Sequence, residues 1–179
     1  MKFALDCTVE VGETSSTPSA LLESIDQHRE ALAEVSGLEG VLLLVLDGKQ
    51  TTGADYSDPI LRLAGTWLRK VPWVIGGDTE TVALRNSEHC FAFVPAGNGV
   101  EISFFEGDEA EIEEYVIDPT TVRLEDFAEA SIGFGDRVVA LVEAIDPALL
   151  ESNEDCQDLK ASLEQAREAW HDYTVHQRR

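Results

Sequence analysis

The chain contains 179 residues, of which 35 are acidic and 13 are basic, so its formal charge at neutral pH is −22. Hydrophobic residues make up 44% of the sequence, which is ordinary for a folded domain and excludes a disordered acidic tail. The longest purely apolar run, 41–46, is far shorter than the roughly 20 residues that a membrane-spanning helix needs. Together these features predict a single domain over residues 1–179 with a sizeable core.

Neither the start of the chain nor its cysteines indicate secretion. Asp6 interrupts the apolar residues near the amino terminus, so the apolar core of a signal peptide is missing there. The cysteines, Cys7, Cys90 and Cys156, are odd in number and widely spaced, which argues against a disulfide framework or a zinc knuckle. We therefore expect a cytoplasmic protein in a reducing environment.

The first 75 residues predict two strands and two helices. Residues 3–11 alternate between apolar and polar, as in a half-buried strand, and 41–46 is a continuous apolar run typical of a buried strand. Between them, Thr17 and Pro18 begin a helix over 18–36 that Gly37 ends. This order permits a parallel crossover between the two strands. A second helix is expected over 58–70, ended by Pro72.

The middle of the chain predicts a meander of antiparallel strands over 79–117. Candidate strands at 79–85, 89–94 and 100–105 are separated by polar or glycine-rich turns. Residues 111–117 favour a fourth strand, but 108–111 also suit the first turn of a helix, so 108–114 is left open between the two.

The last third predicts helices over 124–145 and 155–176. Gly133 and Gly135 interrupt the first helix, which favours a kink or a turn between two helices. The second carries an apolar seam too short for a coiled coil, which favours packing inside the domain. The seam consists of Cys156, Leu159, Leu163, Ala166, Trp170 and Tyr173. The predicted class is α+β, with one mixed or mostly antiparallel sheet of about five to six strands packed by four helices.

No residue pattern predicts catalysis or a metal or other cofactor. Glu168, His171, Asp172 and His176 lie close along one helix, but a metal would need a further ligand and an enclosed pocket, so a polar helix end is favoured. His89 and Cys90 are neighbours on a strand and point to opposite faces, so they do not form a base and nucleophile pair. The glycines of 131–136 lack the lysine and preceding strand of a phosphate loop.

The charge distribution singles out one segment. Residues 101–129 contain eleven acids and one base, and the few basic residues elsewhere are scattered, so binding to nucleic acids or anionic membranes is not expected. If Val100, Ile102 and Phe104 face the core, Phe105 points the other way, among carboxylates, as an anchor for a basic partner would. The alternative is that a C-terminal helix covers Phe105 and the acids form a solvated rim. The predicted partner-binding residues are Glu101, Phe105, Glu106, Asp108, Glu109, Glu111, Glu113, Glu114 and Tyr115.

Three functions remain. In size, charge and lack of catalytic motifs the chain resembles acidic immunity proteins that block cationic bacterial toxins, which implies a non-enzymatic inhibitor of a basic protein such as a nuclease. The second is a small enzyme or ligand-binding domain using His89, Arg85 and Glu101 on one sheet face. The third is an adaptor or assembly subunit. The chain is expected to be a monomer or a dimer through helix 155–176.

Overall fold

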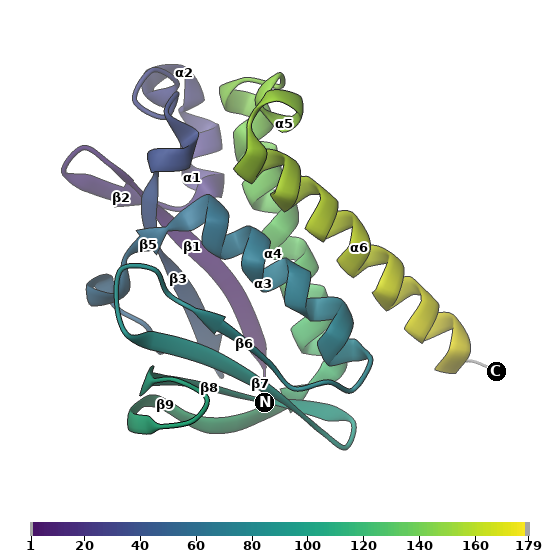
Figure 1. Ribbon diagram of the computed structural model, residues 1–179. Coiled ribbons are helices and arrows are strands. Elements are labelled where there is room, and N and C mark those ends of the chain that lie inside the picture. Colours follow the sequence, from purple (N-terminus) through teal and green to yellow (C-terminus); the bar gives the residue numbers. More distant parts are fainter. Residues whose placement is uncertain (1, 178–179) are drawn as a thin grey trace.

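The computed structural model describes residues 2–177, which form a single α+β domain with two antiparallel sheets (Figure 1). The first sheet has the strand order β2-β1-β3-β4, with β5 also paired to β3, and the second has the order β6-β7-β8-β9. The strands of the first sheet are β1 (Phe3–Val11), β2 (Thr14–Ser16), β3 (Glu39–Leu46), β4 (Lys49–Gln50) and β5 (Asp58–Pro59). Those of the second are β6 (Glu80–Ala83), β7 (His89–Ala96), β8 (Gly99–Gly107) and β9 (Ile112–Arg123).

The α+β class and the meander are confirmed, but the strands divide into two sheets rather than one. β1 and β3 pair antiparallel, from Phe3 opposite Leu46 to Val9 opposite Gly40, so the chain between them makes no parallel crossover. The meander is longer than expected because β9 continues to Arg123. Residues 108–111 are a turn, and β9 begins at Ile112, which settles the choice between helix and strand for 108–114.

The expected helix over 18–36 is broken into short pieces. These are α1 (Pro18–Glu23), α2 (Ile25–His28) and the 3₁₀ turn η1 (Val35–Gly37). Thr17 caps α1 as expected, accepting a hydrogen bond from the Ala20 amide at 3.3 Å. The helix ends at Ser24, whose φ of −131° is far from helical values. Leu21, Leu32 and Val35 still reach the core, so the apolar spacing is satisfied without a continuous helix.

Two helices continue through residues expected to stop or bend them. α3 (Ile60–Ile75) runs past Pro72, because Val71 and Val74 continue its buried face and the chain turns only at Gly76. α4 (Leu124–Ile145) is unbroken at Gly133 and Gly135. A Cβ atom on Gly135 would lie 2.8 Å from side-chain carbons of both Leu68 and Leu163, so this glycine permits close packing of three helices.

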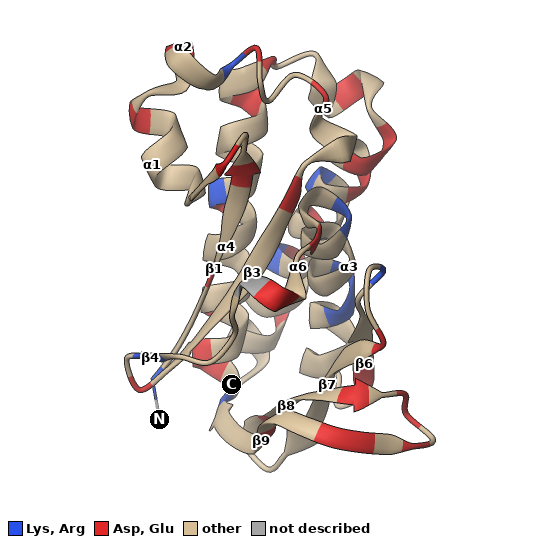
Figure 2. Cartoon of the chain, turned by 90° about the vertical axis from the view of Figure 1, so that its left-hand side faces the viewer, with Lys and Arg blue, Asp and Glu red and all other residues tan. Residues whose placement is uncertain are grey.

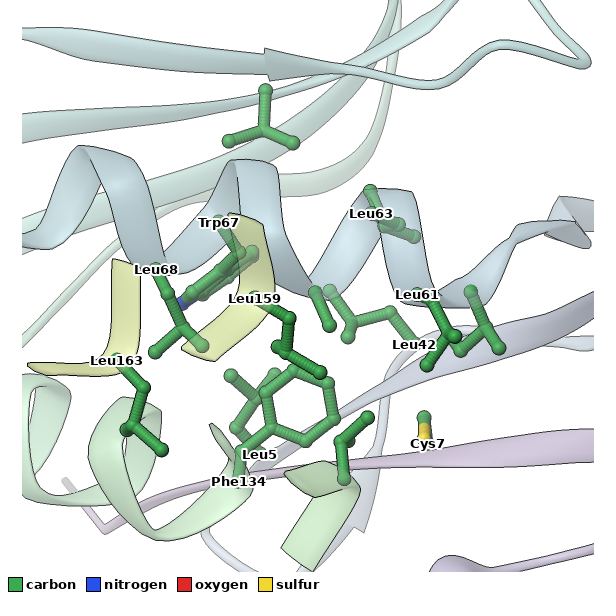
Figure 3. Close-up of a cluster of buried hydrophobic side chains, with 14 of the residues drawn as sticks. Leu5, Cys7, Leu42, Leu61, Leu63, Trp67, Leu68, Phe134, Leu159 and Leu163 are labelled. Carbon is green, nitrogen blue, oxygen red and sulfur yellow. The ribbon is translucent and has the colours of Figure 1, made fainter. Parts of the chain in front are cut away.

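The core lies between the inner faces of the sheets and the helices α3, α4 and α6 (Glu154–Gln177), with the short α5 (Leu149–Ser152) joining the last two (Figures 1 and 3). Trp67 is fully buried, packs edge-on against Phe91 and Phe93, and donates from its indole nitrogen to the Ser131 hydroxyl at 3.0 Å. One side chain thus joins α3 to the second sheet and to α4.

The seam of α6 packs inside the domain, as expected, over its first four positions. Cys156, Leu159, Leu163 and Ala166 are buried, and Figure 3 shows Leu159 and Leu163 directed toward Leu68 and Phe134. Further along, the Trp170 and Tyr173 rings are stacked on each other and only half-buried. Within residues 2–177, no helix is both long and apolar enough to cross a membrane.

Candidate functional site: the acidic hairpin

The second sheet has one face toward the helices and one away from them. Val100, Ile102 and Phe104 are buried in the main core, as predicted, so Ser103 and Phe105 point to the opposite face. Cys90 of β7 lies opposite Phe105, and Tyr115 of β9 lies on its other side, so these three side chains share the outer face. The sequence therefore predicted the orientation of Phe105 correctly.

The segment 105–115 forms what we call the acidic hairpin: the end of β8, a turn at 108–111 and the start of β9. The Asp108 carboxylate accepts hydrogen bonds from the amides of Ala110 and Glu111 at 2.8 and 3.0 Å, and the Asp108 amide donates to the Glu111 carbonyl at 3.0 Å. Gly107 precedes the turn with φ +115°, which side chains of L-residues rarely adopt. Asp108 and Gly107 thus hold the turn, while the side chains of Glu111, Glu113 and Glu114 are exposed to solvent.

Gly107→Ala is expected to weaken the hairpin. A Cβ atom there would lie 2.1 Å from the Glu111 carbonyl oxygen, and the backbone would also be strained, so we expect a loss of about 1–3 kcal/mol in the free energy of unfolding. Urea denaturation followed by circular dichroism measures this loss. Gly37→Ala is the control, because a Cβ atom on Gly37 meets nothing within 4 Å. Equal losses in the two variants would contradict the assigned role of Gly107.

Phe105 is not the exposed anchor that the sequence suggested, because only 2% of it is accessible. Its ring meets the Tyr115 ring edge-on, with centroids 6.0 Å apart. The hairpin tip also reaches back across the outer face, where the Thr81 hydroxyl of β6 donates to the Glu109 carboxylate at 2.5 Å. Phe105 is therefore covered from its own outer face rather than by a C-terminal helix.

The hairpin tip also affects the thiol beside Phe105. Burial is the largest effect and raises the pKa of Cys90, whereas a hydrogen bond with the Thr81 side chain lowers it. The Glu109 carboxylate raises the pKa again, and the Val82 backbone and the Asp108 carboxylate have smaller effects, lowering and raising it respectively. The thiol therefore stays protonated and is a poor nucleophile. This electrostatic setting fits a packing role for Cys90.

The tip of the hairpin borders an open hollow of about 340 Å³. It is lined by Glu88, Gly107, Asp108, Glu111 and Glu113. In Figure 2, acidic residues colour this end of β8 and β9 and the adjoining β6, as they also colour the chain around α5 and the start of α6. Ile112 and Tyr115, which are 43% and 41% exposed, supply apolar surface on the same hairpin. A hollow lined by acidic residues can accept a cationic side chain, and the exposed apolar residues of the hairpin can add apolar contacts to the same partner.

The structure brings together some of the predicted binding residues and separates others. Asp108, Glu109, Glu111, Glu113, Glu114 and Tyr115 are all exposed on the hairpin. Glu106 is half-buried and pairs with Glu114 on the inner side of the sheet, next to His89. Glu101 lies on the outer face opposite Val94, toward the other end of β8, and does not belong to the tip.

Glu88 was missed by the sequence interpretation. It precedes β7, and its carbonyl oxygen accepts a hydrogen bond from the Gly107 amide at 2.7 Å, which places it beside the hairpin turn. The signal lay in the pairing of the meander strands: with His89 opposite Glu106, the residue before β7 lies opposite Gly107, the last residue of β8. Only the register of the strands reveals this, and the register was not predicted.

The residues of the enzymatic alternative do not meet on one sheet face. His89 lies on the inner side, with its ring 4.9 Å from Tyr56 and its Nδ1 3.1 Å from the Ser87 hydroxyl. Glu101 lies opposite Val94, which is an odd number of residues from His89 along β7. Because successive side chains of a strand point to opposite faces, Glu101 lies on the outer face. Arg85 lies in the turn before β7, where its amide donates to Asp58. The expectation that neighbouring strands unite these three residues was wrong.

Within residues 2–177, no three His, Cys, Asp or Glu side chains are arranged to hold a metal ion. On α6, the His176 ring nitrogen Nδ1 lies 2.7 Å from the Asp172 carbonyl oxygen, a contact within the helix. Comparison with protein-family models, with curated proteins and with solved structures finds no match to this chain.

Proposed function

We propose that the protein is a non-enzymatic binding protein that neutralises a basic macromolecular partner through the acidic hairpin, as an immunity protein or antitoxin neutralises a cationic bacterial toxin. The observation that carries this proposal is the hollow lined by four acidic residues, Glu88, Asp108, Glu111 and Glu113, together with the exposed Ile112 and Tyr115 of the same hairpin. Charge complementarity accelerates encounter, and an apolar anchor slows dissociation.

The charge of the whole chain supports the same proposal. The basic surface with which a nuclease binds phosphate is complementary to a chain of charge −22. Attraction between two such surfaces raises the association rate constant above the ordinary value of roughly 10⁵–10⁶ M⁻¹s⁻¹. Fast association suits an inhibitor that must act before its target does. The three cysteines are buried and unpaired, which fits a reducing compartment such as the cytoplasm.

Affinity capture from a lysate of the native host tests the proposal. The immobilised chain should retain a basic protein that elutes as the salt concentration rises. The variant Glu88→Lys/Glu111→Lys/Glu113→Lys should no longer retain this basic protein. Asp108 is left unchanged in the variant because its carboxylate holds the turn. The matched control, Glu23→Lys/Glu143→Lys/Glu164→Lys, changes the net charge by the same amount as the hairpin variant, but at exposed positions on helices. It should still retain the basic protein. Loss from both variants, or from neither, would contradict binding at the hairpin.

A further inference from the structure

The apolar seam of α6 leaves the core at its last two positions. Leu163 and Ala166 are buried, whereas Trp170 and Tyr173 are half-buried and do not belong to the core that residues 2–177 form. The two rings stack on each other, with centroids 5.4 Å apart and planes inclined by 15°. Two large aromatic side chains at the end of a charged helix leave apolar surface in contact with solvent, and a ligand can cover that surface.

These two rings line a hollow of about 440 Å³, which we call the aromatic hollow. Its other walls are the turn between β7 and β8, which contributes Asn98, and the junction of β9 with α4, which contributes Arg123 and Glu125. The volume lies in the range of about 300–1,000 Å³ that small-molecule sites occupy. The aromatic hollow is therefore large enough for a small ligand.

Backbone contacts fix the walls that face α6. The Leu124 amide donates to the Asn98 carbonyl at 3.1 Å, and Gly99 pairs with Arg123 in the register of β8 and β9. A Cβ atom on Gly99 would lie 2.5 Å from the Val122 carbonyl oxygen, so glycine permits this close approach of the turn to β9. The fold thus sets the place of Asn98 relative to Arg123 before a ligand binds, and such preorganisation lowers the cost of binding.

The walls are polar but carry no net charge. Asn98 and Gln177 contribute amides and Thr174 contributes a hydroxyl, all of which combine donors with acceptors. Among the described residues that line the hollow, the charged ones are Arg123 and Glu125, which form an ion pair with each other. This part of the surface is therefore locally neutral in a chain of charge −22.

This combination of groups selects one class of ligand. An anion would compete with Glu125 for Arg123, and a cation would compete with Arg123 for Glu125. An uncharged planar aromatic molecule would cover the rings but make little use of the amides and the hydroxyl. A hexose ring matches both parts of the hollow, because its C–H groups stack on aromatic rings and its hydroxyls both donate to and accept from polar side chains.

We propose that the aromatic hollow binds a single uncharged hexose ring, free or at the end of a glycan, which stacks on the Trp170 and Tyr173 pair and forms hydrogen bonds with the polar walls. The proposal does not depend on the function proposed above, because the hollow adjoins the Gly99 end of β8 and the acidic hairpin lies at the Gly107 end. The hairpin variant Glu88→Lys/Glu111→Lys/Glu113→Lys should therefore bind the hexose as tightly as the unmodified chain.

NMR titration of the full chain tests this proposal. The probes are glucose, galactose, mannose and their methyl glycosides, each added to about 50 mM so that dissociation constants in the millimolar range are detected. At least one probe should shift the indole N–H signal of Trp170, which is assigned by its loss in Trp170→Phe. The signal of Trp73 is the internal control and should not shift, because this tryptophan is exposed but does not line the hollow.

Two variants locate the bound hexose. Trp170→Ala should weaken binding at least about tenfold, whereas Trp73→Ala removes an exposed tryptophan elsewhere and should leave the affinity unchanged. Asn98→Ala removes the side-chain amide but keeps the backbone hydrogen bond to Leu124, and it should weaken binding about threefold or more. Saturation-transfer difference NMR, which observes the sugar protons, measures these affinities without the Trp170 signal.

The free hexoses and their methyl glycosides distinguish the two sources of the ligand. Tighter binding of a free hexose supports a free sugar, and equal or tighter binding of its glycoside supports the end of a glycan. Four results would overturn the proposal: no shift of the Trp170 signal with any probe, an equal shift of the Trp73 signal, unchanged affinity in Trp170→Ala or in Asn98→Ala, or tighter binding of the uncharged aromatic amide benzamide than of any sugar.

Discussion

Trp67→Ala is expected to lower the free energy of unfolding by about 3–5 kcal/mol, the range for removing a large buried aromatic side chain. The indole fills the centre of the contact between α3, α4 and the second sheet, where it packs against Phe91, Phe93 and Phe127. The truncation also leaves the buried Ser131 hydroxyl without its hydrogen-bond donor. Urea denaturation at constant temperature measures the loss.

The same helix supplies a matched control. Trp73 lies six residues further along α3 and is 57% exposed, so Trp73→Ala should change stability by no more than about 0.5 kcal/mol. The comparison isolates burial, because residue type, helix and substitution are the same. Similar losses in the two variants would contradict the assignment of Trp67 to the centre of the core.

Asp58→Ala is expected to cost about 3 kcal/mol, because hydrogen bonds to a buried charged group are stronger than neutral ones. The Asp58 carboxylate is fully buried at the start of α3, where it accepts from the amides of Arg85 and Asn86 at 2.7 and 2.8 Å. Its other oxygen lies 3.7 Å from the Arg62 guanidinium. Since Asp58 belongs to the first sheet and residues 85–86 lead into the second, this side chain links the two sheets.

Asp158→Ala is the matched control for Asp58. Asp158 pairs with Arg69 at 3.6 Å, almost the same separation, but both partners are more than half exposed. Exposed ion pairs contribute about 0.2–1 kcal/mol, so its loss should be small. Urea denaturation of both variants gives the comparison, and a loss in Asp58→Ala no larger than in Asp158→Ala would show that the link between the sheets contributes little.

Local patterns were sufficient to predict the meander and the two long C-terminal helices. Strand alternation fixed the inward residues Val100, Ile102 and Phe104 and hence the outward direction of Phe105. Helix 124–145 matches α4 residue for residue, because its apolar face and the Pro147 that follows are both local signals.

The errors arose where packing between distant segments overrides local preference. Pro72 and Gly135 are helix breakers by propensity, yet α3 and α4 continue through them because their buried faces continue on either side. The division of the strands into two sheets depends on which strands pair, and no local pattern specifies that. The expected helix over 18–36 shows the reverse error. Its apolar residues have helical spacing, yet the helix ends at Ser24.

The candidate site was predicted in composition but not in shape. The acids of 106–114 were identified from their density, whereas the hollow depends on Glu88, which only the pairing of β7 with β8 brings to the hairpin. Phe105 was chosen as the anchor because its orientation could be predicted. The burial of Phe105 could not be predicted from local patterns, because the hydrogen bond between Thr81 and Glu109 that closes this face joins residues 28 positions apart.

The most direct test of the acidic hairpin as the binding surface is the association rate constant of the basic partner recovered by affinity capture, measured by stopped-flow fluorescence at low and high salt. For Glu88→Lys/Glu111→Lys/Glu113→Lys we expect association at low salt to slow by about tenfold or more relative to the control Glu23→Lys/Glu143→Lys/Glu164→Lys, with the difference shrinking as salt rises. Equal rate constants for the two variants at every salt concentration would show that only net charge matters and would contradict binding at the hairpin.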